Sequence, residues 1–207
     1  MDPATEARVR EAADVLRRGG LVAYPTETFY GLGALARDAA AVERLARVKG
    51  RPDGKPLPLL AADRAQAEEV ALLGEAAARL AGAFWPGPLT LVLPARAGLP
   101  AAITAGTGTV GIRVPGGEIA RALARLAGGA IVSTSANLSG EPPPAAAAEL
   151  APSLAARLDA VLDGGRTPGG LPSTVVALDA AGAGVRLVRA GAVPLDAVRA
   201  ALRAEGR

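Results

Sequence analysis

LTLVLPA (residues 89–95) and TVGIRVP (residues 109–115) are the clearest strand signals in this chain. Both are short, rich in aliphatic or β-branched residues and bounded by Pro or Gly, which is the pattern of buried strands. In the second segment aliphatic residues alternate on one face. Arg113 therefore lies on the opposite face, either in solvent or on the floor of a cleft. The two segments predict the centre of a β-sheet.

Helical and extended segments alternate on both sides of this pair. Further strands are expected over residues 21–24, 56–62, 130–134, 159–165, 173–179 and 185–191. Helices are expected over residues 5–18, between an Asp38 cap and Gly50, over residues 63–84 with a break near Gly74, over residues 117–127 and 142–158, and from Pro194 onward. The order is not strictly β-α-β. We therefore expect an α/β fold with an open, twisted, mixed sheet of about seven strands and flanking helices, formed as a single domain over residues 1–207.

The composition excludes several kinds of chemistry. The chain contains no cysteine and no histidine, so disulfides, thiolate nucleophiles, serine–histidine triads and histidine–zinc sites are all excluded. The formal net charge of +3 favours anionic ligands but is too small to indicate nucleic-acid binding by itself. The sequence has neither a signal-peptide core nor a long apolar run. We therefore expect a cytoplasmic protein that does not contact a membrane.

The first polar segment is YPTETFYGLG (residues 24–33), directly after a predicted strand. It holds three of the five aromatic residues, two threonines and a glutamate. Hydroxyl groups and backbone amides at a strand end are well placed to bind a small polar ligand. The alternative is a turn whose threonines bond to their own backbone.

The second segment, RVKGRPDGKPL (residues 47–57), holds the only two lysines of the chain, whereas arginines are spread along its whole length. Several cations there can converge on a polyphosphate, because Arg gives a bidentate contact and Lys a mobile point charge. Arg47 and Lys49 have a second explanation, since cations stabilise a helix C-terminus. Arg51 and Lys55 lie beyond the predicted helix end, so they are stronger candidates for phosphate binding than Lys49. The spacing is not that of a Walker A loop.

The third segment, STSANLSG (residues 133–140), follows a strand and contains the only asparagine, Asn137. Its hydroxyl and amide groups can bind a phosphate, a metal-bound water or a carboxylate. The alternative is a strand-to-helix cap. PSTVV (residues 172–176) also places hydroxyl groups at a strand start, and Arg189 is an isolated strand arginine. FWPGPLT (residues 84–90) is interpreted as core packing and a turn.

Six segments, in this order, resemble the YrdC family: PTETFYGLG (25–33), KGRPDGKPL (49–57), WPGPLTLV (85–92), GIRVP (111–115), STSANLSG (133–140) and PSTVV (172–176). The family's KxR…SxN signature appears as Lys49 and Arg51 with Ser135 and Asn137. The similarity extends over roughly residues 9–200. It implies the YrdC-like form of the α/β fold, an open twisted sheet with a large basic concave face.

The resemblance also implies a function, that of an L-threonylcarbamoyladenylate synthase, which is a nucleotidyltransferase. Such enzymes make threonylcarbamoyl-AMP and pyrophosphate from L-threonine, bicarbonate and ATP. Other proteins then transfer the threonylcarbamoyl group to the adenosine beside the anticodon of tRNA. The expected partners are these substrates and transfer proteins, with direct contact to tRNA or other RNA as a further expectation. Mg²⁺ is expected as a cofactor that enters with ATP, with no dedicated metal ligands.

Site residues are carried over from the family motif by motif. The expected catalytic residues are Lys55, Arg51 and Lys49. The expected ATP-binding residues are Arg51, Lys55, Thr109, Ser135, Asn137 and Arg189. The expected threonine-binding residues are Thr28, Arg113, Ser133 and Ser173, with Arg113 pairing the threonine carboxylate.

The chain departs from the longer family members in two ways. Leu60 stands where those members have a histidine that helps to bind threonine, and the chain has no room for their second C-terminal domain. It therefore resembles the short, single-domain type. Two other functions remain open: an RNA- or nucleotide-binding module of the YciO type without synthase activity, and the carbamoyl-transfer domain of hydrogenase-maturation proteins. Five aromatic residues give little surface for stacking on RNA bases.

Overall fold

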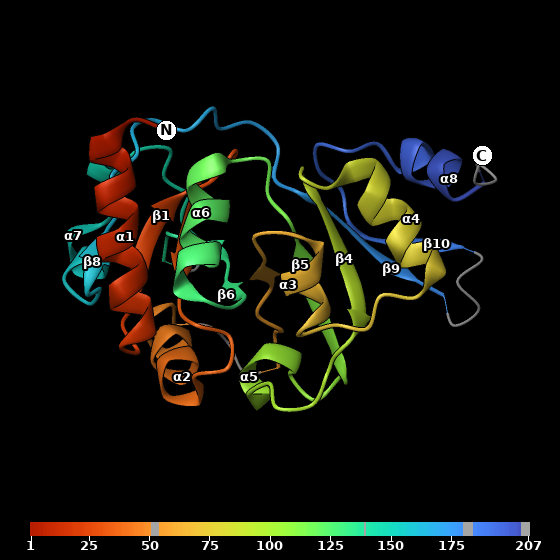
Figure 1. The fold of residues 1–207 in the computed structure, drawn as a ribbon, viewed down its shortest axis with the longest axis horizontal. Helices are drawn as coiled ribbons and strands as arrows, with labels where there is room; N and C mark the ends of the chain where they lie inside the picture. Colours follow the sequence, from red (N-terminus) through yellow and green to blue (C-terminus); the bar gives the residue numbers. More distant parts are fainter. Residues whose placement is uncertain (51–53, 139, 180–183, 204–207) are drawn as a thin grey trace.

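Two mixed β-sheets with helices packed against them form the protein (Figure 1). The computed structural model describes residues 1–50, 54–138, 140–179 and 184–203. The helices are α1 (Pro3–Arg17), α2 (Ala39–Val48), α3 (Arg64–Glu68), α4 (Glu75–Phe84), α5 (Ala101–Thr104), α6 (Glu118–Ala127), α7 (Pro152–Ala155) and α8 (Leu195–Arg203), with a 3₁₀ turn η1 (Ala147–Glu149). The strands are β1 (Val22–Pro25), β2 (Tyr30–Gly33), β3 (Leu59–Leu60), β4 (Leu89–Pro94), β5 (Thr109–Arg113), β6 (Ile131–Val132), β7 (Thr134–Ser135), β8 (Ala160–Val161), β9 (Thr174–Leu178) and β10 (Val185–Arg189).

The predicted mixed α/β class is confirmed, but the strands are divided between two sheets. The smaller sheet has the order β7-β2-β1-β8 and the larger has the order β10-β9-β4-β5-β3-β6. The division falls within the strand predicted over residues 130–134. Its first part is β6 in the larger sheet, and its last residues continue into β7 in the smaller sheet. Between them the Ser133 amide donates to the Pro58 carbonyl at 2.8 Å, so this crossing holds the two sheets together.

The strands predicted over residues 89–95 and 109–115 form the centre of the larger sheet, as β4 and β5. β4 and β5 pair antiparallel, with Leu91 opposite Ile112, and β4 also pairs parallel with β9. Leu91 and Ile112 are fully buried in the larger hydrophobic core. Helix α4 packs against β4, and α8 packs against α4 and β10 (Figure 1). Arg113 ends β5 on the side where the two sheets meet.

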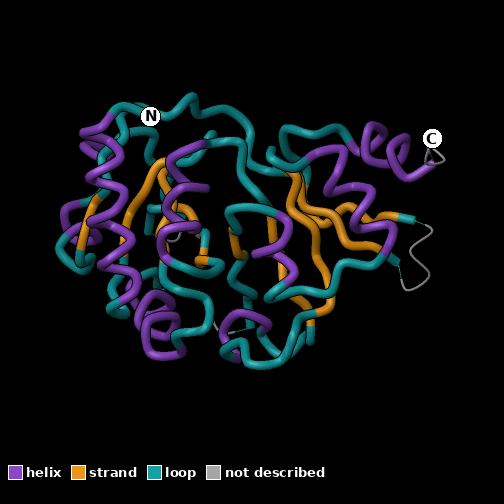
Figure 2. Tube along the Cα trace, in the orientation of Figure 1, coloured by secondary structure: helices purple, strands orange, loops and turns teal. Residues whose placement is uncertain are grey.

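A second core lies under the smaller sheet. Helix α1 packs against α6, and both contact β1, so that Leu16, Leu123 and Tyr24 are fully buried together. Figure 2 shows the same arrangement of helices and strands. Strand β10, at an edge of the larger sheet, is mostly exposed. No helix within the described ranges is long and apolar enough to cross a membrane.

Helix α2 positions one of the two lysines. As predicted, Asp38 is its N-cap, with the Asp38 carboxylate accepting from the Ala41 amide at 3.0 Å. Val42 and Leu45 are buried on its inner face. The helix ends at Val48 with Lys49 as the C-cap, and Gly50 follows in the left-handed region at φ +58°. The helix end therefore fixes the backbone from which Lys49 projects.

The helix predicted over residues 142–158 is wrong. This stretch forms only η1 and the one-turn helix α7. Three prolines at 142–144 remove amide donors that a helix would need. Neighbouring carbonyls bond across the molecule instead: Pro144 accepts from the Tyr30 amide at 2.9 Å and Ala145 from the Thr167 amide at 2.8 Å. Tertiary hydrogen bonds thus outweigh the helix propensity of alanine here.

Candidate functional site

A cavity of about 660 Å³ lies where the two sheets meet. Its wall takes residues from β2 and β7 of the smaller sheet and from β3, β4, β5, β9 and β10 of the larger sheet. The polar side chains that line it are Thr26, Thr28, Lys49, Thr90, Arg113, Ser133, Thr134, Ser135, Asn137, Ser173 and Arg189. Three of these side chains are cations and none is a carboxylate, so within the described residues the wall favours an anionic ligand.

The cavity brings together most of the predicted site residues. Those that line it are Thr28, Lys49, Arg113, Ser133, Ser135, Asn137, Ser173 and Arg189. Two other predicted residues are not part of its wall. Thr109 starts β5, at the end of the strand away from Arg113, and its hydroxyl is 2.9 Å from the Thr107 hydroxyl. Lys55 is exposed in the loop before β3, and Arg51 lies outside the described residues.

Lys49 joins the end of α2 to the segment that follows β7. Its side chain is 6% exposed. The ammonium donates to the Ser135 carbonyl at 2.6 Å and to the Asn137 side-chain oxygen at 2.7 Å. The Ser135 hydroxyl at 3.2 Å and the Asn137 carbonyl also accept from this ammonium. Lys49, Ser135 and Asn137 therefore form one hydrogen-bonded unit. The prediction that Lys49 also takes part in catalysis stays a prediction.

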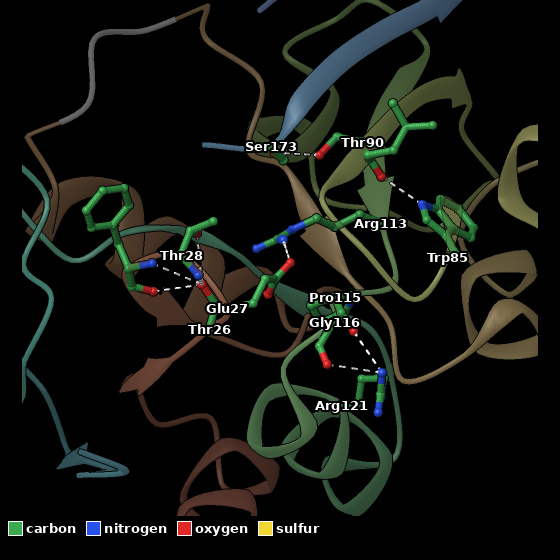
Figure 3. Close-up of polar contacts among 12 residues, drawn as sticks. Thr26, Glu27, Thr28, Trp85, Thr90, Arg113, Pro115, Gly116, Arg121 and Ser173 are labelled. Carbon is green, nitrogen blue, oxygen red and sulfur yellow. Dashed lines mark hydrogen bonds and ion pairs between the residues drawn. The ribbon is translucent and has the colours of Figure 1, made fainter. Parts of the chain in front are cut away.

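Arg113 lies on the cavity wall. Of the two positions predicted for its side chain, in solvent or on the floor of a cleft, the second is correct. Arg113 is 7% exposed, and its guanidinium donates through Nη1 to Oε1 of Glu27 (Figure 3). The other oxygen of this carboxylate, Oε2, is buried without a hydrogen-bond partner among the described residues. The sequence-based prediction missed Glu27. The available signal was a carboxylate between two hydroxyl residues in the first polar segment.

Ser173 links a second guanidinium to the same wall. Arg189 donates through Nη2 to the Ser173 carbonyl at 2.8 Å and to its hydroxyl at 3.0 Å. The Ser173 hydroxyl is 2.9 Å from the Thr90 hydroxyl, a contact that the prediction also missed (Figure 3). Burial lowers the pKa of the Arg189 guanidinium from its usual value, and the neighbouring charge of Arg113 lowers it further. The two guanidinium groups therefore act on the same region of the cavity.

The threonines of the first polar segment have different environments. Thr26 forms the local turn of the alternative interpretation: its hydroxyl donates to the Phe29 carbonyl at 2.8 Å and accepts from the Thr28 amide at 3.2 Å. The Thr28 hydroxyl lies 3.1 Å from that of Thr26, and both residues line the cavity (Figure 3). Thr26 thus shapes the turn that presents Thr28.

These features define the class of protein. A family model described as "Telomere recombination", which covers Sua5, YciO and YrdC proteins, matches residues 14–191. The chain belongs to this family, and the predicted YrdC resemblance is confirmed.

The similarity to individual members is also high. The chain is 44% identical over 194 residues to a threonylcarbamoyl-AMP synthase of Pyrococcus abyssi, an alignment that covers 93% of this chain and 56% of that protein. The chain thus spans little more than half the length of this relative. The crystal structure of P. abyssi Sua5 complexed with L-threonine has a TM-score of 0.89 at 43% identity, covering 96% of this chain and 58% of that one. The crystal structure of Escherichia coli YciO has a TM-score of 0.82 at 29% identity and covers 93% of each chain.

Proposed function

We propose that this chain is a threonylcarbamoyl-AMP synthase, which joins L-threonine, bicarbonate and ATP and releases pyrophosphate. The observation that carries the proposal is the cavity wall, where two guanidinium groups and several hydroxyls from both sheets converge on one space. Its volume of about 660 Å³ is within the usual range for small-molecule sites. The name of the P. abyssi relative and the threonine bound to P. abyssi Sua5 support the same activity.

The proposed site has a threonine part and a nucleotide part. Threonine would contact Thr28, Arg113, Ser133 and Ser173, which all line the cavity. Arg113 is suited to the carboxylate, because a guanidinium gives two parallel N–H···O bonds to a carboxylate. The nucleotide would contact Ser135, Asn137 and Arg189 in the cavity, with Thr109 and the cations Arg51 and Lys55 contributing from beyond the described wall.

The proposed reaction forms no covalent bond to the protein, as suits a chain without cysteine or histidine. The threonine amine attacks the carbon of CO₂, which forms from bicarbonate, and loses a proton to give a carbamate. A carbamate oxygen then attacks the α-phosphorus of ATP. The P–O bond to the β-phosphate breaks, and pyrophosphate leaves with the electron pair. The side chains contribute by positioning and by neutralising charge on the phosphates.

Mg²⁺ fits this scheme as part of the substrate. The cavity wall holds no carboxylate, and the described residues contain no cluster of three or more acidic side chains that could hold a metal ion. A magnesium ion coordinated mainly by phosphate oxygens needs few protein ligands. It would enter as MgATP and reduce the negative charge of the phosphates.

The proposal is tested by pyrophosphate release. The purified protein is incubated with MgATP, with and without threonine and bicarbonate, and pyrophosphate is measured with a coupled assay. Release that requires both threonine and bicarbonate is the expected result. Serine in place of threonine serves as a control for amino-acid selectivity. Pyrophosphate release that is independent of threonine, or no release at all, contradicts the proposal.

An RNA- or nucleotide-binding module of the YciO type is the second candidate, because the match to the YciO structure covers 93% of each chain. The same preparation distinguishes the two functions. Retention of tRNA on a filter without threonine-dependent pyrophosphate release favours the module. In the synthase proposal, threonylcarbamoyl-AMP passes to the separate proteins that modify tRNA.

A further inference from the structure

Glu27 is a partly buried carboxylate next to the cavity wall. Its neighbours Thr26 and Thr28 both line the cavity, but Glu27 does not. Its side chain points toward the Arg113 guanidinium, as Figure 3 shows. The exposed fractions of the two side chains are 19% for Glu27 and 9% for Arg113. A buried charge pair of this kind costs desolvation energy, so it needs a reason beyond general stability.

The guanidinium of Arg113 has more donors than this pair uses. A guanidinium carries five N–H groups in a fixed plane. Among the described residues, Glu27 supplies the one hydrogen-bond acceptor for them. Because the guanidinium is rigid, fixing one nitrogen on Glu27 also sets the direction of the remaining donors. Arg113 lines the cavity, so those donors are available to an anion inside it.

Two glycines give the carboxylate its place. Gly117 is the N-cap of α6, and a Cβ added there would lie 3.1 Å from the Glu27 amide nitrogen and 3.7 Å from Oε2. A Cβ on Gly116 would lie 3.7 Å from Cγ of Glu27. The carboxylate is therefore packed against the start of a helix, where the helix dipole favours a negative charge. The two oxygens of this carboxylate have different neighbours: Oε1 accepts from Arg113, and Oε2 lies near Gly117 at the start of α6.

The geometry points to Glu27 as a positioning residue for the amino-acid substrate: it fixes the Arg113 guanidinium from behind, so that the free N–H donors face the substrate carboxylate in the cavity. This inference rests on the proposed function, in which Arg113 pairs with the threonine carboxylate. Glu27 itself does not contact substrate. Its effect is confined to the ligand that Arg113 binds, which separates it from a general effect on the fold.

Removing the charge of Glu27 has two opposing consequences. The wall becomes more positive, which by itself would attract an anion. The guanidinium is also released, and small misplacements of a binding group are costly. Glutamine is neutral, so its oxygen holds the guanidinium by a weaker hydrogen bond than a carboxylate does. Its NH₂ group would also face the start of α6, where the helix dipole favours a negative charge. We therefore expect Glu27→Gln to raise KM for threonine by about tenfold to a hundredfold, with KM for ATP little changed.

The test compares three variants by threonine-dependent pyrophosphate release. Glu118→Gln is the matched control, since it removes an exposed carboxylate at the same end of α6. It should behave as wild type. Gly117→Ala removes no charge but presses on Glu27, so it should also raise KM for threonine selectively. This second variant keeps the inference testable if Glu27→Gln does not fold, as judged by thermal melting. Unchanged KM for threonine in either folded Glu27→Gln or Gly117→Ala overturns the inference.

A spectroscopic readout separates this inference from the proposed function. The Nη1–H resonances of Arg113, whose nitrogen donates to Glu27, should be sharp and slowly exchanging in the wild type when observed by ¹⁵N NMR without substrates. They should broaden or exchange rapidly in Glu27→Gln. Unchanged resonances mean that Glu27 does not fix the guanidinium, whatever reaction the protein catalyses. A wild type without threonine-dependent activity refutes the proposed function but leaves these resonances as an independent test of Glu27.

Discussion

Replacing Arg113 by lysine tests the proposed threonine site most sharply. The substitution keeps a positive charge on β5 but replaces a planar fork by a single ammonium. Arg113→Ala is a poorer choice, because it leaves the partly buried Glu27 carboxylate without its cation, and breaking a buried pair costs about 3–5 kcal/mol of stability. With lysine we expect the loss of one of two charge-assisted hydrogen bonds to the threonine carboxylate.

The magnitude follows from the strength of such a bond. A hydrogen bond to a charged group contributes about 1.5–3 kcal/mol. At about 1.4 kcal/mol for each factor of ten, threonine affinity should fall roughly 10- to 150-fold. ATP affinity should change less than about threefold, because the lysine keeps the positive charge that Arg113 places beside Arg189. Most of the loss should appear as faster dissociation of threonine.

Isothermal titration calorimetry measures both affinities. Threonine is titrated in the presence of a non-hydrolysable ATP analogue, and the analogue is titrated separately. Arg125→Lys is the matched control, the same substitution at an exposed position on α6. Equal losses for threonine and the analogue, or an unchanged threonine affinity, would show that Arg113 does not hold the carboxylate.

Three further outcomes are expected. Lys49→Met removes the donor that the Ser135 and Asn137 oxygens share, and it should lower the free energy of unfolding by roughly 2–4 kcal/mol. This loss should appear as a drop of roughly 5–15 °C in calorimetric melting temperature. Arg47→Met, at an exposed position, should show little change, and equal melting temperatures would refute the holding role of Lys49. The pKa of Asp159 is lowered chiefly by its hydrogen bond from Arg44, so the stabilising effect of this carboxylate is present above the unfolded-state pKa and is lost as the pH falls through the folded-state pKa. In urea unfolding, the difference in free energy of unfolding between wild type and Asp159→Asn should therefore shrink between about pH 7 and about pH 3. A difference that stays constant over this range contradicts the assignment. Lys55→Ala should have the melting temperature of the wild type, because Lys55 is exposed. In the pyrophosphate assay the same variant should lose about 2–4 kcal/mol of transition-state stabilisation. Full activity of this variant excludes a role of Lys55 at the phosphates.

Local patterns in the sequence were enough to predict the elements that depend on local patterns. β4 and β5 were predictable because aliphatic side chains fill one buried core, and α2 because Asp38 caps it and Gly50 ends it. Most of the candidate residues predicted from the family motifs line one cavity. The division into two sheets was not predictable, because it depends on how residues 130–135 pair with distant strands.

The features that sequence reasoning missed are contacts between residues that are distant in sequence. Glu27 and Arg113 are 86 residues apart, and no periodicity marks them as a pair. Lys49 is explained locally as a helix-end cation, yet its ammonium bonds to oxygens of Ser135 and Asn137 across the cavity wall. The alanine-rich stretch after the prolines looked helical because propensity is local, whereas its carbonyls are used by Tyr30 and Thr167. Tertiary hydrogen bonding decided each case.

The central claim is that one cavity joins threonine, bicarbonate and the AMP part of ATP. The protein is incubated with MgATP, threonine and ¹³C-labelled bicarbonate. The products are then separated, and their masses are measured by mass spectrometry. We expect a threonine- and protein-dependent product that contains AMP, threonine and the labelled carbon in one molecule. This labelled product should be absent when bicarbonate is unlabelled or threonine is omitted. AMP or ADP formed without a labelled threonine adduct would refute the proposed reaction.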